Sequence, residues 1–375
     1  MSLKGKAGFN IGEGSGKVRK PITGNYNLNR RSMEFFKKAN YILYFFIAAY
    51  LILYQLSTFF IPFTFGIFFS MLIVPVSNFL ETYKFSTLLS SLTATFIFFV
   101  SLGCLSYIFI FQFSQLAEQL PEIRDEIQSA IERIQLFIAA ETGLSFERQQ
   151  DMAERRTDTL WELVEPRITA FLSGIMDFSI GFLLTFVYVF LLLLNRHKFI
   201  DFIISMYSTG RKEENVRDAL NKISRVVHQY LWGRIQVMTT LAVMYYITFL
   251  IFGLPFALLV TLFGALITVI PYIGPLVSGV VPITVAVIYF GDPYYILMFS
   301  LIIMVIQLIE SYVLEPLIIG KEMKINALAV IVAIILGGII WGIAGMILFV
   351  PILATIKIIA NHSEGFKPVG YLLGK

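Results

Sequence analysis

The stretch Ile267–Pro282, with the sequence ITVIPYIGPLVSGVVP, decides how the rest of the chain is interpreted. It contains three prolines and two glycines within otherwise apolar sequence. Each proline removes a backbone hydrogen-bond donor and clashes with the preceding helical turn, and each glycine weakens a helix interior. The stretch therefore predicts a helix that is broken in the middle of hydrophobic sequence.

The composition predicts a protein that crosses a membrane repeatedly. Of the 375 residues, 57% are hydrophobic and 14% are charged, and the mean hydropathy is +0.77. An ordinary soluble domain has about a quarter of its residues charged. Apolar runs that could cross a hydrocarbon layer of roughly 30 Å are expected at 41–61, 63–80, 88–113, 178–194, 237–252 and 295–314. The expected fold class is all-α, a polytopic helical membrane protein, with Pro62 ending its first helix.

Two basic segments orient the chain across the membrane. Residues 1–40 hold nine Lys and Arg against two Glu, and residues 195–235 hold eight basic and four acidic residues. The positive-inside rule places both segments in the cytoplasm. We expect 1–40 to be a disordered basic tail and 195–235 to be an amphipathic helical region. The segment 362–375 is expected to be a second cytoplasmic tail.

The segment 114–172 differs from the spans on either side of it. Residues 114–168 carry twelve acidic residues and six arginines but no lysine. Apolar residues recur at spacings of three and four between Leu116 and Ile138, which is typical of an amphipathic helix. We therefore expect a helical extracytoplasmic insert, preceded by three N-terminal spans at 41–113 and followed by a fourth span at 173–194.

The segment 236–361 is expected to be a transport core. Its two long apolar segments, 254–290 and 327–360, are interrupted, the first by the opening stretch and the second by GGIIWGIAG at 337–345. These two broken helical hairpins begin from opposite faces of the membrane, which makes an inverted repeat. Such repeats point to a secondary transporter whose site lies near the membrane midplane. The alternative is that glycine and proline only allow kinks or close helix packing.

Glu310 is the expected carrier of a proton or cation. An ionisable side chain within an apolar span is costly and by default indicates function. Gln307 lies three residues before Glu310 on the same helical face, and Ser311 follows it directly. The alternative role for Glu310 is structural, as the partner of a lysine or of backbone donors.

Enzymatic, cofactor and metal chemistry find no support in the sequence. The three histidines are scattered without metal-ligand spacing, and no HExxH motif is present. Cys104 is the single cysteine, so it cannot form an internal disulfide, and we expect it to pack as a small hydrophobic residue.

Several motifs together resemble the AI-2E family of permeases over about residues 41–360. They are IPYIGPLVSGVVP at 270–282, QLIESYVLEPLIIGK at 307–321, GGIIWGIAGMILFVP at 337–351, QYLWGR at 229–234, LPE at 120–122 and an early hairpin ending in VPVSNFLE at 74–81. The candidate pathway and ion-coupling residues, most of them carried over from these motifs, are Glu310, Gln307, Ser311, Pro271, Tyr272, Gly274, Pro275, Gly338, Gly342, Gly345 and Pro351. Pro316 and Gly320 also match.

The resemblance implies a permease of the bacterial cytoplasmic membrane that exports a small polar solute such as autoinducer 2, a quorum-sensing molecule. It also implies an alternative, the exchange of sodium or lithium for protons. Two further alternatives remain, a passive channel and a scaffold or regulatory protein that acts through the external insert. The expected partners are the solute, a proton or sodium ion, the lipid bilayer and further copies of the chain. No cofactor, nucleic acid or enzymatic activity is expected, and both termini are expected in the cytoplasm.

Overall fold

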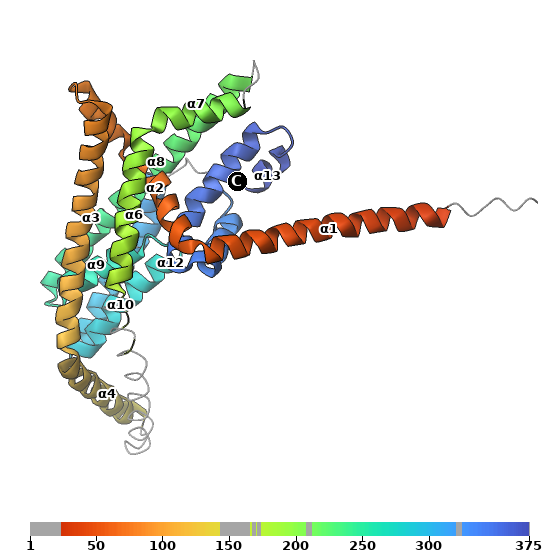
Figure 1. The fold of residues 1–375 in the computed structure, drawn as a ribbon. Coiled ribbons are helices and arrows are strands. Elements are labelled where there is room, and N and C mark those ends of the chain that lie inside the picture. Colours follow the sequence, from red (N-terminus) through yellow and green to blue (C-terminus); the bar gives the residue numbers. More distant parts are fainter. Residues whose placement is uncertain are drawn as a thin grey trace, which may run out of the picture. The chain divides into compact units, whose positions relative to one another are not determined.

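The computed structural model describes residues 24–142, 166, 170, 174–207, 212–319 and 325–374. Within these residues every regular element is a helix, and the one extended contact is an isolated antiparallel bridge between Ile325 and Gly374. Figure 1 labels most of the helices. The chain divides into two compact units, 1–53 and 54–375, which are described separately. The expected all-α fold is confirmed for the part of the chain that the structure describes.

The first unit is described from Gly24 onward, where α1 (Gly24–Gln55) begins. The expectation of a disordered tail up to residue 40 is therefore wrong for 24–40, because these residues belong to the same helix as the apolar run that starts at Tyr41. Helix propagation from an established turn costs little, so an apolar helix extends readily into neighbouring polar residues. Residues 1–23 lie outside the described part.

The boundary between the first two helices lies earlier than the sequence suggested. α1 ends at Gln55 and α2 (Ser57–Thr82) begins two residues later, so the expected span 41–61 is divided between them. Pro62, the expected helix end, lies inside α2 together with Pro75. Proline is tolerated inside membrane helices because neighbouring helices satisfy the backbone groups that it leaves free.

Five of the described helices are long and apolar enough to cross a membrane. They are α2, α3 (Thr87–Glu118), α8 (Lys212–Ile251), α11 (Pro293–Ile309) with its continuation η1 (Glu310–Ile319), and α12 (Ala327–His362). A sixth candidate is α6 (Ile175–Leu194) with α7 (Arg196–Tyr207), which are bent by 67°. The expected spans other than the first correspond to these helices. α1 is not among the described helices that are long and apolar enough to cross a membrane.

The expected amphipathic region 195–235 does not form an element of its own. It comprises α7 and the first part of α8, and α8 continues without a break to Ile251, one residue short of the end of the expected span 237–252. The amphipathic face and the membrane span are therefore parts of one 40-residue helix.

α4 (Leu120–Thr142) confirms the helical start of the expected insert. It follows α3 almost directly, and its Arg133 donates a hydrogen bond of 2.7 Å from Nη2 to the carbonyl oxygen of Ile288. Ile288 lies at the end of α10 (Ile273–Tyr289), so the insert helix is attached to the first broken hairpin. Of the insert beyond Thr142, only residues 166 and 170 are described.

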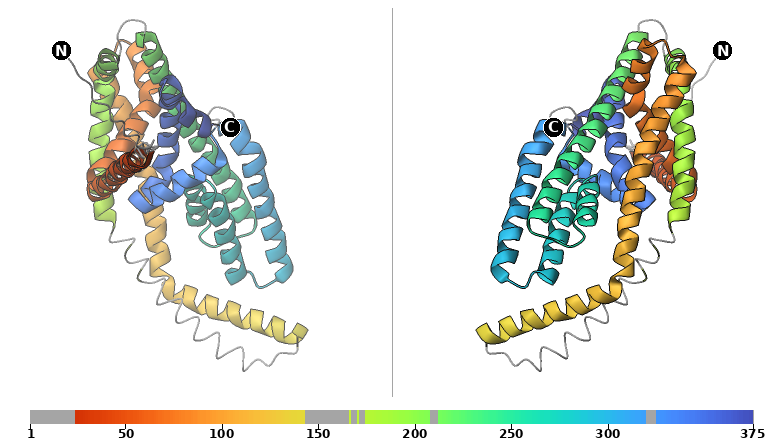
Figure 2. Two further views of the ribbon diagram at one scale, coloured as in Figure 1. Left: turned by 90° about the vertical axis from the view of Figure 1, so that its right-hand side faces the viewer. Right: turned by 90° about the vertical axis from the view of Figure 1, so that its left-hand side faces the viewer.

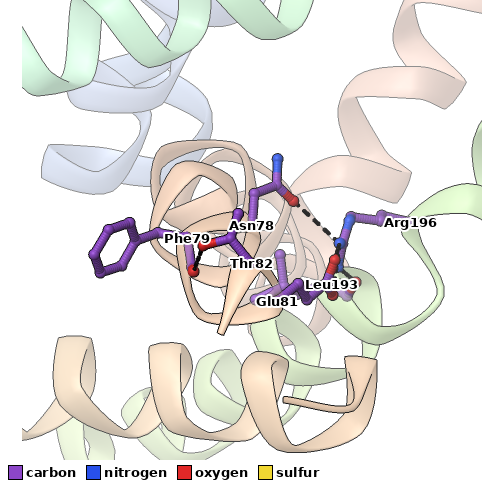
Figure 3. Close-up of polar contacts among 6 residues, drawn as sticks. All are labelled: Asn78, Phe79, Glu81, Thr82, Leu193 and Arg196. Atoms are coloured by element: carbon purple, nitrogen blue, oxygen red, sulfur yellow. Dashed lines mark hydrogen bonds and ion pairs between the residues drawn. The ribbon is translucent and has the colours of Figure 1, made fainter. Parts of the chain in front are cut away.

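α2, α3 and α6 form one packed group within the second unit. Gly66 allows α2 to approach α6, since a β-carbon at this position would lie 2.7 Å from Cβ of Tyr188. At one end of the group, Arg196 donates to both carboxylate oxygens of Glu81 at 2.8 Å and to Oδ1 of Asn78 at 3.1 Å (Figure 3). The apolar core of the group consists of Leu72, Ile73, Ala94, Phe99, Val189 and Leu193.

α8, α9 (Ala257–Ile267), α10 and α11 form the second packed group. Figure 2 shows α8 (green to teal) and α11 (light blue) running side by side, with the short α9 and α10 packed against them. The core of this group is made of Val237, Leu241, Tyr245, Phe249, Leu254, Val260, Ala286, Phe299, Ile303 and Ile306. This group holds the first broken hairpin and the candidate carrier residue.

Candidate functional site

The first broken hairpin is interrupted as the opening stretch predicts. α9 ends at Ile267 and α10 begins at Ile273, and Tyr272 between them is exposed with a φ of +65°. The joint lies at 268–272, slightly earlier than the PYIGP motif at 271–275. Gly274 and Pro275 belong to the first turn of α10, where proline is tolerated because the first backbone N–H groups of a helix have no intrahelical acceptor.

Gly274 allows the two halves of this hairpin to meet. A β-carbon at this position would overlap the backbone of Thr268 and would lie 2.5 Å from the carbonyl oxygen of Ile267. Pro271 is buried at the same joint. Gly274 therefore has a packing role, which supports the close-packing reading at this residue.

The second broken hairpin lies within α12, as GGIIWGIAG predicts. The helical backbone is interrupted at Trp341 and at Gly342, whose φ is +60°. On either side of this break, Gly337 and Gly345 are in backbone contact, and a β-carbon on Gly338 would lie 2.7 Å from Cε of Met346. Pro351 is buried further along the second half. The glycines of this hairpin thus pack its two halves against each other.

Both broken hairpins use α8 as a common neighbour. α9 packs on the half of α8 that contains Tyr245, while α12 packs on the half that contains Tyr230. Tyr230 belongs to a buried cluster with Ile334 and Val350, one from each half of α12. α8 is therefore in contact with both broken hairpins.

A polar cluster of Gln307, Tyr245 and Ser278 connects three helices of the second packed group. Gln307 Nε2 on α11 donates to Tyr245 Oη on α8 at 2.7 Å and to Ser278 Oγ on α10 at 3.0 Å. Tyr245 and Ser278 are completely buried. A β-carbon on the adjacent Gly279 would lie 3.2 Å from Gln307 Nε2, so this glycine leaves room for the amide. The cluster places hydrogen-bonding groups inside otherwise apolar packing.

Glu310 lies one turn beyond Gln307 and has no exposed surface. Neither of its carboxylate oxygens has a hydrogen-bond partner among the described residues. An ionised carboxylate removed from water costs several kcal/mol unless it is paired. The alternative of a lysine or backbone partner for Glu310 therefore finds no support in this part of the chain. A bound proton, a bound cation or a nearby positive charge would stabilise it.

The positive charge near Glu310 belongs to Arg234 of α8. Arg234 Nη1 is paired with Glu315 Oε1 at 2.8 Å, and its side chain is 5% exposed. Electrostatic interactions connect Glu310 with both Arg234 and Glu315. Arg234, Glu310 and Glu315 are called the charged cluster below.

Sequence reasoning found part of this site. Gln307 and Glu310 lie in it, and Ser311, next to Glu310, is exposed. Tyr272 is exposed at the joint of the first broken hairpin, and Gly338 and Gly345 make their closest contacts within α12. Tyr245, Ser278 and Arg234 were missed. Ser278 stands in the opening stretch and Arg234 ends the QYLWGR motif, so both offered a local signal, but Tyr245 has no feature that separates it from the other aromatic residues. Gly320 lies outside the described residues.

Among the described residues, no group of three or more His, Cys, Asp or Glu side chains could hold a metal ion. A cavity of about 400 Å³ lies between α4, Phe256 and Tyr289, where Glu122, Asp125 and Glu126 line it. It is separate from both the polar and the charged cluster.

Comparisons with known proteins agree with the motifs. Residues 42–365 match the model of the AI-2E family transporters. The chain is 26% identical over 321 residues to YrrI of Bacillus subtilis, and the match covers 82% of this chain and 87% of that protein. YrrI is named as a transport protein, and its name gives no solute. YueF of the same organism is 27% identical over 194 residues, about half of each chain. The AI-2 transport protein TqsA of Escherichia coli is 31% identical over 104 residues, which cover 28% of this chain and 30% of TqsA.

Proposed function

Because this chain belongs to the AI-2E family of transporters, we propose that it exports a small polar solute such as autoinducer 2, and that Glu310 couples this export to an ion gradient. The solute and the direction of transport belong to the proposal. The name of TqsA supports the choice of autoinducer 2 as the first solute to test.

The observation that carries the proposal is the buried carboxyl of Glu310, which has no hydrogen-bond partner among the described residues. A protein that served only as a scaffold would gain stability by replacing such a group with an apolar side chain of similar size. A group that must bind and release a proton or cation has to be free of a permanent partner. Among the described residues Glu310 has no such partner, and it lies one turn beyond Gln307, which bonds Ser278 of the first broken hairpin.

The polar cluster supports a polar solute. A tyrosine hydroxyl, a serine hydroxyl and a glutamine amide can each donate and accept hydrogen bonds, so the cluster can replace the water around a solute rich in hydroxyl groups. Its three members come from α8, α10 and α11. Because Ser278 belongs to the first broken hairpin, the cluster supports a path beside that hairpin, which a relative movement of the three helices would open.

The test is solute flux in proteoliposomes that contain the purified full-length chain. Vesicles loaded with autoinducer 2 are followed with no gradient, with a proton gradient and with a sodium gradient. The proposal predicts export that a gradient accelerates and that Glu310→Gln reduces to the undriven rate. Gradient-driven flux that survives Glu310→Gln would show that the coupling residue is wrongly assigned.

The same assay separates the alternatives. Flux that follows only the solute gradient would indicate a channel, and sodium flux without solute flux would indicate an ion exchanger. If neither solute flux nor sodium flux is observed, the scaffold or regulatory role is the alternative that remains. Thr284→Val serves as the matched control, because Thr284 is an exposed residue of α10 whose hydroxyl bonds the carbonyl of Val280 within the same helix.

A further inference from the structure

The charged cluster contains one cation and two carboxylates. The guanidinium of Arg234 is paired with Glu315, yet its Nε has no hydrogen-bond partner among the described residues. Glu310 begins η1, which packs against α8, the helix that carries Arg234, and neither of its carboxylate oxygens has a hydrogen-bond partner among the described residues. Glu315 is 36% exposed, whereas Glu310 is completely buried. One donor and one acceptor of opposite charge are thus both available in the same buried region.

The helix that carries the two carboxylates has an uncommon geometry. η1 is a π-helix that begins at Glu310 and contains Pro316. In an α-helix, neighbours on one face are three or four residues apart, so two carboxylates five residues apart would point in different directions. In a π-helix the backbone hydrogen bonds join residues five apart, which widens the turn and brings Glu310 and Glu315 closer to the same side. Of the two, Glu315 contacts α8 through Arg234.

α8 and η1 approach closely at this level. A β-carbon on Gly233 would lie 3.3 Å from the carbonyl oxygen of Ile318. Gly233 directly precedes Arg234, so the close approach brings the base of the arginine side chain to the π-helix. α8 also brings two titratable tyrosines near the cluster: Tyr230 interacts electrostatically with Arg234, and Tyr245 with Glu310.

We propose that Arg234 is a positioning residue for coupled transport, and that its guanidinium exchanges between Glu315 and Glu310. In the arrangement seen here it pairs with Glu315 and leaves Glu310 free to hold a proton or cation. When Glu310 releases its ion, the guanidinium moves to the vacated carboxylate and neutralises it. This exchange leaves Glu315 ionised without its partner, but Glu315 is 36% exposed and can be solvated. Because a buried unpaired charge is unfavourable, the exchange lets the empty transporter return without an uncompensated buried charge at Glu310.

This inference rests on the proposed function, since it assumes that Glu310 is the coupling group, but its first test needs no solute. The thermal unfolding temperature of the purified full-length protein in detergent is measured for wild type, Glu310→Gln, Glu315→Gln and the double variant. If Arg234 pairs with Glu310 when Glu315 is neutralised, each single variant leaves Arg234 one carboxylate partner, and the double variant removes both. Its unfolding temperature should then fall by at least about 5 °C more than the sum of the two single shifts.

A control cycle uses the exposed pair of Arg217 and Glu213 on α8, which are 3.3 Å apart. Glu213→Gln combined with Glu310→Gln should give additive shifts, because exposed pairs contribute little and these sites share no partner. If the shifts in unfolding temperature are also additive for Glu310→Gln and Glu315→Gln, the proposed exchange of Arg234 is overturned. A double variant that does not fold while both single variants fold is the extreme form of the expected result. Glu315→Asp replaces Glu315→Gln if that single variant cannot be purified.

A second measurement uses flux. In Arg234→Gln with Glu315→Gln, a neutral hydrogen-bonding pair replaces the ion pair. If the pair only holds α8 to η1, this variant folds and keeps gradient-driven flux. If Arg234 must also reach Glu310, the variant folds but its gradient-driven flux falls at least about ten-fold. This is the scale expected when a buried charge loses its partner. If the unfolding shifts are non-additive but the wild-type protein shows no flux, the proposed function is rejected and the exchange is kept. If the unfolding shifts are additive and the wild-type flux is intact, the exchange is rejected and the proposed function is kept.

Discussion

Gly337 and Gly345 lie on opposite sides of the break in α12 and are in backbone contact, because a β-carbon built on either one overlaps the backbone of the other. The two halves of the second broken hairpin can meet only where both residues lack a side chain. This relationship explains why the segment GGIIWGIAG is rich in glycine at positions eight residues apart.

Gly345→Ala should therefore destabilise the protein. Overpacking of a close contact costs about 1–3 kcal/mol, and here the atom to be displaced is backbone. Thermal unfolding followed by intrinsic fluorescence would measure the loss. Gly103→Ala is the control, since a β-carbon at Gly103 in α3 meets nothing within 4 Å. Equal unfolding temperatures for the two variants would contradict the close crossing.

Tyr245→Phe should lower solute flux while Tyr246→Phe leaves it unchanged. The two tyrosines are adjacent on α8, but Tyr245 is completely buried and accepts the hydrogen bond of Gln307, whereas Tyr246 is 38% exposed. Leaving a buried donor unsatisfied costs about 1–3 kcal/mol, which corresponds to roughly a ten-fold change or more in a rate or affinity. Initial export rates from proteoliposomes would show the difference. A similar loss in both variants would indicate that the polar cluster is not part of the path.

Arg196→Ala should reduce the free energy of unfolding by about 1–3 kcal/mol, the range for hydrogen bonds to charged groups. Arg196 joins α2 to the end of α6 through Glu81, Asn78 and the carbonyl oxygen of Leu193, and its side chain is 11% exposed. Arg217→Ala removes an exposed pair and should change stability by less than about 0.5 kcal/mol. Chemical denaturation of both variants in the same detergent provides the comparison. If Arg196→Ala costs no more than Arg217→Ala, the contact in Figure 3 contributes little to stability.

The predicted inverted repeat can be tested by thiol labelling. Cys104→Ser removes the single cysteine, and new cysteines are placed at the exposed residues Ile251 and Ala327, which precede the two broken hairpins. A membrane-impermeant maleimide applied to intact cells should label Ile251→Cys, and should label Ala327→Cys only after the cells are opened. Labelling of both from the same side would end the inverted-repeat interpretation.

The sequence predicted the local features of this protein well because they depend on neighbouring residues. The interruption before Ile273 and the break at Gly342 follow from proline and glycine in apolar sequence, and Glu310 stands out as a charge within a span. Pro62 was misjudged because its tolerance inside α2 depends on the helices around it. Similarly, the pairing of Arg234 with Glu315 joins residues 81 positions apart. No periodicity in the sequence brings them together, so only the fold reveals the charged cluster.

The length of α8 has a mechanical consequence. A helix of 40 residues extends over about 60 Å, which is roughly twice the thickness of the hydrocarbon layer, so a large part of this rod must project beyond it. The rod touches the second hairpin at Tyr230 and the first at Phe249, with Arg234 between them. If it tilts about a pivot near Arg234, these two contact points swing in opposite directions. A single lever would then loosen one hairpin while it presses on the other.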